Sequence, residues 1–202
     1  MWKVIGIPLV LYLIFVFYVY EPAAPEEILV AELIKEMPVD TVLQYIEHYS
    51  TLAIQEMQRA KIPASITLGQ AILESQYGTS ELALQANNHF GIKAEPKWDS
   101  MDRHCIYSYE WSQKKQRMYP MLSCFRRYNN IQESYIGHSN FLTNRPYYTN
   151  LFNLDINDFK GWAHGLQKAG YATDPNYAQK LISIIHRYQL HRYDKKEVLN
   201  ES

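Results

Sequence analysis

Residues 66–78 form one helix-forming segment that is apolar almost throughout and ends in a carboxylate and a glycine. Its Ile, Leu and Ala side chains are spaced so that they can face a core, which predicts a largely buried helix. Glu74 lies in the last turn of that helix, and Gly78 is the residue expected just past its end. The segment therefore predicts a single carboxyl group at the end of an apolar helix.

This placement predicts a raised pKa for Glu74. The C-terminal end of a helix carries partial negative charge, which opposes a second negative charge. An apolar surround opposes ionisation as well. A glycosidase needs a carboxylic acid that is still protonated near neutral pH, because that acid protonates the leaving-group oxygen. The alternative interpretation of Glu74 is a solvated residue at a helix end with no catalytic role.

Several blocks around this helix resemble one known family. The blocks are residues 70–83, which contain Glu-Ser-x-x-Gly, and residues 87–93, 124–128 and 161–178. Together they resemble the glucosaminidase family, glycoside hydrolase family 73, which cleaves peptidoglycan glycan strands. The resemblance runs from about Val39 to Tyr193. It implies a mainly α, lysozyme-like domain that acts on peptidoglycan, and this hydrolysis needs no cofactor.

The N-terminal region predicts export. Residues 4–20 are apolar, interrupted only by Gly6 and Pro8, and Lys3 is their charged neighbour. Such a run is at the short end of what crosses a bilayer and is longer than the usual core of a signal peptide. We expect an uncleaved membrane anchor with Lys3 inside and the domain outside. A cleaved signal segment is the alternative, and both place the domain in the cell envelope or outside the cell.

The chain divides into four expected parts. They are a membrane anchor or signal segment (1–20), a Pro-rich acidic linker with a short helix (21–38), the catalytic domain (39–193) and a polar tail (194–202). A formal net charge of -1 leaves no basic footprint for nucleic acid. The expected partners are peptidoglycan glycan strands and, through the N-terminal helix, the membrane. A monomer is expected.

Turn and capping signals predict the elements of the domain. A capping box at residues 41–44 predicts the start of a long helix that ends before Pro63, and Pro63 opens the Glu74 helix. Residues 106–111 and 118–125 predict one β-hairpin with a charged tip. Further helices are predicted over residues 28–37, 80–86, 130–142, 155–169 with Gly170 as the terminating residue, and after Asp174, the expected cap of the last helix.

The chain has two cysteines, Cys105 and Cys124, which flank the predicted hairpin. In an exported domain such a pair predicts a disulfide, and two free thiols are the alternative. His104 lies beside Cys105, but two Cys with scattered His show no recognisable metal-ligand spacing. No metal site is predicted.

A second carboxylate is expected across the groove from Glu74, because most glycosidases use two. The family resemblance points to an acidic residue near the hairpin. Glu110 is the best candidate, and Asp99 and Asp102 are the alternatives. The acetamido group of the substrate is a further alternative, since substrate assistance removes the need for a protein nucleophile.

Five residues are candidates for substrate binding: Tyr171, Tyr177, Asn88, His89 and Trp162. The resemblance implies that a Tyr near the Ala-Thr-Asp-Pro turn lines the site, where a phenol can hydrogen-bond a sugar and help to orient the acid. Core packing is the alternative for Tyr177 and Trp162. For Asn88 the alternative is a role in holding its own turn, and for His89 it is a structural His with satisfied hydrogen bonds.

The leading functional hypothesis is an exported β-N-acetylglucosaminidase with Glu74 as general acid. A lytic transglycosylase or a muramidase would share the logic of a catalytic Glu and is the first alternative. The second is a non-catalytic peptidoglycan-binding module, because residues 94–124 depart from what the resemblance leads us to expect.

Overall fold

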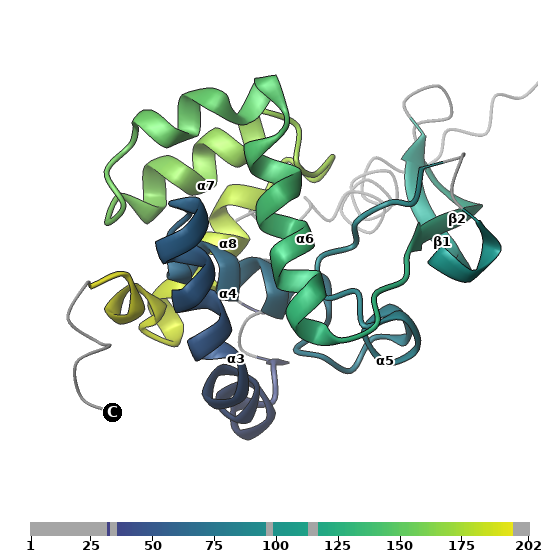
Figure 1. The fold of residues 1–202 in the computed structure, drawn as a ribbon, viewed down its shortest axis with the longest axis horizontal. Coiled ribbons are helices and arrows are strands. Elements are labelled where there is room, and N and C mark those ends of the chain that lie inside the picture. The colour runs from purple at the N-terminus through teal and green to yellow at the C-terminus, as the bar shows by residue number, and fades with distance from the viewer. Residues whose placement is uncertain (1–31, 33–35, 96–98, 113–116, 196–202) are drawn as a thin grey trace, which may run out of the picture.

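The computed structural model describes residues 32, 36–95, 99–112 and 117–195, and its fold is mainly helical with one small hairpin, as predicted. A helical body holds most of the elements, and the hairpin projects from one side of it (Figure 1). The elements in chain order are α3 (Val39–Ala60), α4 (Ala64–Glu74), α5 (Glu81–Ala86), η1 (Ser100–Asp102), β1 (Arg103–Ser112), β2 (Arg117–Arg126), α6 (Ile131–Thr143), η2 (Pro146–Asn153), α7 (Phe159–Lys168), α8 (Tyr177–Arg187) and η3 (Leu190–Asp194).

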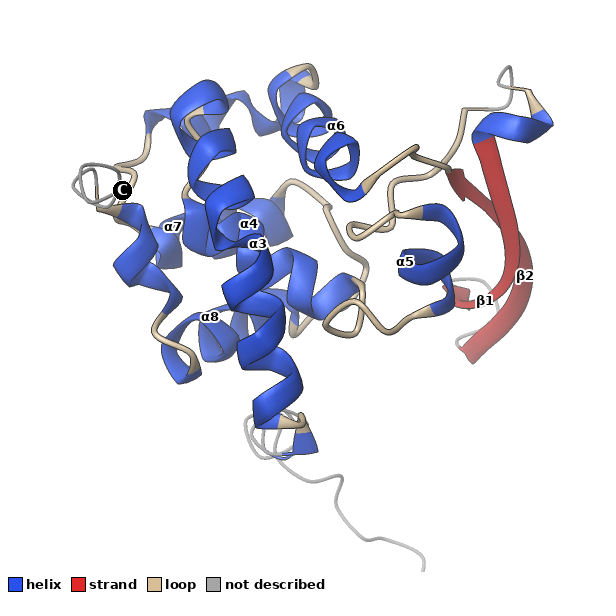
Figure 2. Cartoon of the chain, turned by 60° about the horizontal axis from the view of Figure 1, so that its bottom comes forward, coloured by secondary structure: helices blue, strands red, loops and turns tan. Residues whose placement is uncertain are grey.

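Helix α4 lies in the middle of the helical body (Figure 2). It is buried from Ala64 to Ile72, and it packs against α3, α7, α8 and η3. The approach of α8 is close: a Cβ on Gly69 would lie 2.7 Å from Cδ1 of Leu181. Burial of the Ile and Leu side chains of α4 stabilises this enclosed position by about 1.5–3 kcal/mol for each side chain. The prediction of a buried helix is therefore confirmed.

The hairpin is longer than the sequence predicted, and a disulfide links its two strands. β1 and β2 pair antiparallel with Cys105 opposite Cys124, and these two residues are bonded. The predicted disulfide is thus confirmed. On the opposite face of the strands, Ile106 and Phe125 pack with Leu82 and Ala86 of α5, so α5 lies between the hairpin and the body (Figure 2).

Two predicted helix starts were wrong. Helix α3 begins at Val39 directly after Pro38 and has no side-chain cap, so Thr41 lies inside the first turn rather than at its start. Helix α7 begins at Phe159, because Asp158 caps it by accepting the N–H of Gly161 at 2.9 Å. The residues before it form a separate turn, in which Asp155 accepts the N–H of Asn157.

The predicted cap of the last helix was also wrong. Helix α8 begins at Tyr177, and Asn176 is its N-cap residue, without a side-chain bond. Asp174 instead accepts the N–H of Asn176 at 2.9 Å and pairs with Lys180 at 2.6 Å. Asp174 therefore holds the turn that leads into α8.

The predicted membrane segment, residues 4–20, and almost all of the predicted linker lie outside the described residues. Among the helices that are described, none has the length and apolar character needed to cross a bilayer. Asp194, which the sequence assigns to the polar tail, is buried and ends η3.

Candidate active site

Glu74 is the last residue of α4, and a left-handed turn follows it. The hydroxyl of Ser75 donates to the carbonyl of Ala71 at 2.5 Å and accepts the N–H of Gly78 at 2.8 Å. Gln76, Tyr77 and Gly78 then have φ of 50°, 49° and 84°. The helix therefore ends four residues before Gly78, earlier than predicted. Each non-glycine residue in this region costs about 1–2 kcal/mol, which marks the turn as an imposed conformation.

The carboxyl of Glu74 is half-buried, and burial raises its pKa to about 7. A hydrogen bond from Tyr177 lowers this pKa, and the negative charge of Asp174 raises it. A large fraction of Glu74 is therefore protonated near neutral pH. The predicted direction of the pKa shift is confirmed, and such a group can donate a proton to a leaving oxygen.

Tyr177 lies on the first turn of α8, and its side chain is buried between α4 and Tyr171. Its hydroxyl accepts a hydrogen bond from Nε2 of Gln70 at 2.8 Å and interacts with Glu74. Burial, followed by the nearby charge of Glu74, raises the pKa of Tyr177 far above its usual value. Tyr177 is therefore a neutral hydroxyl that can donate to the Glu74 carboxyl.

Tyr171 also lies beside Glu74, and the way in which α7 ends positions it there. Gly170 has φ of 78°, and the N–H of Tyr171 bonds the carbonyl of Leu166 at 3.0 Å, which is the glycine-ended pattern that terminates many helices. The Tyr171 ring then stacks on the Tyr177 ring with 5.5 Å between centroids. Burial and then the Glu74 charge raise the pKa of Tyr171 well above normal. The structure thus brings Tyr171 and Tyr177 together beside Glu74.

The loop at residues 87–92 passes close to Glu74. A Cβ on Gly91, which has φ of 62°, would lie 3.9 Å from Oε2 of Glu74. Asn88 is buried; it donates to the carbonyls of Ile92 and Arg126 and accepts the N–H groups of Phe90 and Ile92. The role of holding the loop accounts for all of these bonds.

His89 and Trp162 lie in packed surroundings. Nδ1 of His89 bonds the hydroxyl of Tyr45 at 2.6 Å, and burial lowers the pKa of His89 to about 4. Trp162 is 1 % exposed and packs edge-on against Phe152. The structural alternative accounts for His89, and the core-packing alternative accounts for Trp162.

The second carboxylate stays a prediction. Glu110 lies in β1 opposite Tyr119, and only its backbone position is described. Asp99 and Asp102 are exposed at the ends of η1. Among the described carboxylates, Asp174 is the one whose charge raises the pKa of Glu74, and it is already paired with Lys180.

Two residues beside the site were not predicted. Gln70 lies four residues before Glu74 and so shares its helix face, and His138 of α6 bonds the Gln70 side chain at 3.0 Å. A polar Gln inside an otherwise apolar helix was the available signal for the first. His138 is 68 residues away in the sequence, so only the fold pairs it with Gln70.

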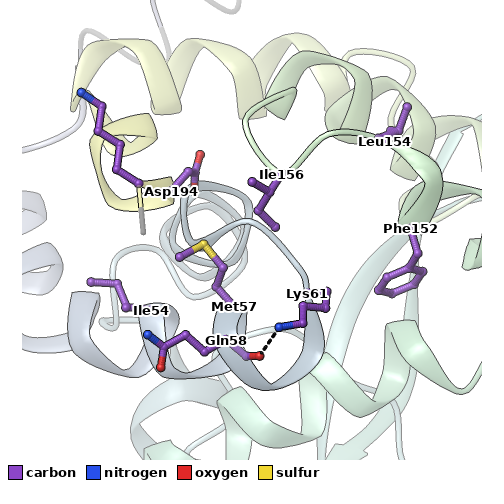
Figure 3. Close-up of a pocket in the computed structure, with 9 residues that line it drawn as sticks. Ile54, Met57, Gln58, Lys61, Phe152, Leu154, Ile156 and Asp194 are labelled. Carbon is purple, nitrogen blue, oxygen red and sulfur yellow. Dashed lines mark hydrogen bonds between the residues drawn. The ribbon is translucent and has the colours of Figure 1, made fainter. Parts of the chain in front are cut away.

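A separate cavity of about 510 Å³ includes Asp194 in its lining, and Figure 3 shows the residues that surround it. Its lining combines apolar side chains of α3 and of the segment around η2 with Asp194. Asp194 accepts the N–H of Ser65, near the start of α4. The cavity therefore lies at the N-terminal end of that helix. Glu74, at the C-terminal end, is not part of its lining. In the described part of the chain, no cluster of three or more His, Cys, Asp or Glu residues could hold a metal ion.

A mainly helical domain with one protonated Glu at the end of a buried helix, beside two neutral tyrosines, has the features of a glycosidase site. The chain belongs to the glucosaminidase family: the family model described as mannosyl-glycoprotein endo-beta-N-acetylglucosaminidase matches residues 50–190. The resemblance seen in the sequence is therefore confirmed, and the domain belongs to a family of glycosidases.

Individual relatives agree with this assignment. The chain is 34% identical over 162 residues to the exo-glucosaminidase LytG of Bacillus subtilis, covering 78% of this chain and 55% of that protein. It is 32% identical over 128 residues to the peptidoglycan hydrolase FlgJ of Vibrio cholerae, covering 61% of this chain and 36% of that protein. The chain thus spans about half the length, or less, of these curated relatives.

Solved structures show the same fold. The catalytic domain of the autolysin Auto from Listeria monocytogenes aligns with a TM-score of 0.66 at 28% identity, over 86% of this chain and 99% of that chain. An N-acetylmuramoyl-L-alanine amidase from Staphylococcus aureus aligns with a TM-score of 0.67 at 33% identity, over 77% of this chain and 44% of that chain. These neighbours support the lysozyme-like helical architecture that the resemblance implied.

Proposed function

We propose that this protein is an exported β-N-acetylglucosaminidase that hydrolyses the β-1,4 bond after N-acetylglucosamine in peptidoglycan glycan strands. The observation that carries the proposal is Glu74, a half-buried carboxyl with a pKa of about 7 at the end of α4, in a domain of this family. The substrate follows from relatives named exo-glucosaminidase and peptidoglycan hydrolase. Export and membrane anchoring rest on residues 4–20.

In the proposed reaction Glu74 is the general acid. Its proton moves to the glycosidic oxygen as the bond between that oxygen and the anomeric carbon breaks, and the leaving sugar departs as a neutral alcohol. Water then supplies a hydroxyl to the anomeric carbon, and the proton that it gives up restores the acid form of Glu74, directly or through solvent. A second group assists the reaction at that carbon, as a nucleophile or as a base for water. We assign this role to Glu110, with Asp99, Asp102 or the substrate acetamido group as alternatives.

The two tyrosines support this chemistry as neutral donors. Both hydroxyls have pKa values well above normal, so each keeps its proton across the working pH range. Tyr177 bonds the Glu74 carboxyl, and we assign to Tyr171 a contact with a hydroxyl or acetamido group of the sugar. Asn88 acts indirectly, by holding the loop that passes Glu74.

The test is digestion of purified sacculi by the full chain, followed by mass spectrometry of the reduced fragments, with Glu74→Gln as control. Fragments ending in reducing N-acetylglucosamine are expected from the wild type and not from the variant. Reducing N-acetylmuramic acid ends would instead identify a muramidase, and anhydro ends a lytic transglycosylase. If both proteins sediment with sacculi equally and neither releases fragments, the protein is a binding module.

A further inference from the structure

Three buried side chains form a hydrogen-bonded series that ends at Glu74. Nε2 of His138 lies 3.0 Å from Oε1 of Gln70, and Nε2 of Gln70 lies 2.8 Å from the Tyr177 hydroxyl. The relative exposure of His138 and Gln70 is 0%, and that of Tyr177 is 2%. The Tyr177 hydroxyl also lies beside the Glu74 carboxyl, because hydrogen bonding from Tyr177 lowers the pKa of Glu74. The series joins α6, α4 and α8.

The direction of each bond follows from the chemistry of the partners. Oε1 of Gln70 can only accept, so Nε2 of His138 must hold the proton of that bond. Burial lowers the pKa of His138 to about 3, so the ring is neutral and has one N–H. Its Nδ1 has no hydrogen-bond partner among the described residues, as expected when the single proton sits on Nε2.

The same reasoning determines the group toward which the Tyr177 hydroxyl donates its proton. Nε2 of Gln70 donates to the Tyr177 oxygen, so the phenol must direct its own proton to a different acceptor. Glu74 provides that acceptor. The other groups around the carboxyl are Tyr171, Asp174 with its partner Lys180, and the backbone of Gly91.

We propose that His138 and Gln70 are positioning residues, which turn the Tyr177 hydroxyl toward one oxygen of Glu74 so that the transferable proton is held on the other oxygen. A carboxylic acid can hold its proton on either oxygen, and only one of them can meet the glycosidic oxygen in line. The oxygen that accepts from Tyr177 is unavailable to the proton. After the transfer, the same bond stabilises the new carboxylate. This inference rests on the proposed role of Glu74.

A purely structural role for this series makes a different prediction about His138. Its ring stacks on Phe90 with 4.1 Å between centroids, so His138→Phe keeps the aromatic packing and removes the donor. His138→Gln loses the stacking but returns an N–H group. If packing matters, the Phe variant is the better enzyme; if the donor matters, the Gln variant is better despite lower stability.

The experiment measures kcat, KM and melting temperature of the full chain on soluble glycan strands, for His138→Phe, His138→Gln and Gln70→Met. Thr67→Val and Ser139→Ala are matched controls, because both hydroxyls are buried near the series and have no described partner. We expect Gln70→Met and His138→Phe to lower kcat about 10- to 100-fold with KM changed little, since misplacement of a reacting group has effects of this size. The controls should retain wild-type kcat.

A second readout does not depend on turnover. Carbon-13 NMR titration of the Glu74 carboxyl should show a higher pKa in Gln70→Met and in Tyr177→Phe, because the donor that favours the carboxylate is misdirected or lost. In a Tyr177→Phe background, Gln70→Met should add little further loss of kcat. Additive losses, an unmoved Glu74 pKa, or a Phe variant better than the Gln variant would overturn the inference. An inactive wild type would overturn the proposed function instead, and the titration would still decide the inference.

Discussion

The two ends of helix α4 each meet a carboxyl group, and the comparison separates a stabilising use of charge from a catalytic one. At the N-terminal end, Asp194 comes from η3 and accepts the N–H of Ser65 at 2.8 Å. At the C-terminal end, the carboxyl is that of Glu74 itself. Asp194 is buried and Glu74 is half-buried, and burial raises the pKa of Asp194 to about 6 and that of Glu74 to about 7.

The electrostatic field of the helix dipole has opposite effects on the two carboxyl groups. The N-terminal end presents unpaired N–H groups and partial positive charge, so an ionised Asp194 is favoured there. Since Pro63 gives no side-chain cap to α4, Asp194 supplies the missing cap from 129 residues away. Glu74 lies at the negative end, where ionisation is opposed. One end of the helix thus gains a hydrogen-bonded cap from a distant carboxyl group, and the other keeps a carboxyl protonated at a cost in stability.

The largest expected effect is on catalysis at Glu74. Glu74→Gln keeps the shape of the side chain and removes the transferable proton, so kcat should fall by about 10²–10⁴-fold or more. Initial rates on sacculi measure this change, and circular dichroism checks that the fold is intact. Near-wild-type activity would overturn the mechanism and reduce Glu74 to a helix-end residue.

The next effect concerns the partner of Glu74 across the groove. If Glu110 has the second role, Glu110→Gln should lower kcat by about 10²-fold or more, and Glu74→Gln/Glu110→Gln should be little worse than Glu74→Gln alone. Asp99→Asn and Asp102→Asn should change kcat by no more than a few-fold. Normal activity in Glu110→Gln would move the role to Asp99, Asp102 or the substrate acetamido group.

The third prediction tests the N-terminal end. Asp194→Ala removes the cap and leaves a buried N–H without its acceptor, so the free energy of unfolding should fall by about 1–3 kcal/mol. Urea denaturation of Asp194→Ala against wild type measures this. The value of kcat at a temperature where both are folded should be unchanged. A drop in kcat without a loss of stability would show that the two ends of α4 are not independent.

The contrast between the ends also explains what the sequence could predict. The raised pKa of Glu74 was predictable because its largest cause, burial, follows from the apolar spacing of α4, although the effects of Tyr177 and Asp174 come from distant parts of the chain. The disulfide was predictable because Cys105 and Cys124 flank alternating strand residues. Asp194, by contrast, was assigned to a polar tail, since nothing near it in the chain shows that it would meet Ser65.

The same limit applies inside the site. Gln70 and His138 come together only because α6 packs near α4, and no local pattern records that contact. Local signals also misled, since residues 41–44 fit a capping box although α3 starts earlier, at Val39. Pro38 already ends the preceding segment and starts the helix, so Thr41 has no free N–H to cap. Features with a local signal in the sequence, such as the apolar spacing of α4 or the two cysteines of the hairpin, were predictable, and contacts between distant elements without such a signal were not.

A smaller effect is the pH dependence of stability. The folded pKa of Glu74 is about 7 against an ordinary 4.5, so the folded state binds more protons than the unfolded state between these values. Stability is therefore lost as pH rises from 4.5 to 7. Glu74→Gln removes this loss and should raise the free energy of unfolding at pH 8 by about 1–3 kcal/mol, with little effect at pH 4. Urea denaturation of wild type and Glu74→Gln at pH 4 and pH 8 measures this difference. An equal change in the free energy of unfolding at both pH values would contradict the raised pKa of Glu74.

The smallest expected effect concerns the midpoint of the alkaline limb of the kcat profile, which Asp194→Asn should leave unchanged. The alkaline limb of the kcat profile should follow the loss of the Glu74 proton, with a midpoint near the pKa of about 7. Asp194 also has a raised pKa, but it titrates at the far end of α4, where its charge meets Ser65 rather than substrate. Asp194→Asn keeps an acceptor for the cap and should leave the midpoint within about 0.2 pH units of wild type, because solvent and counterions weaken interactions between well-separated charges. Tyr177→Phe, measured in parallel, should move the midpoint upward, since it removes a donor that favours the carboxylate. If Asp194→Asn moved the limb as far as Tyr177→Phe, proton release at Glu74 would depend on both ends of the helix, and the separation between a stabilising end and a catalytic end would fail.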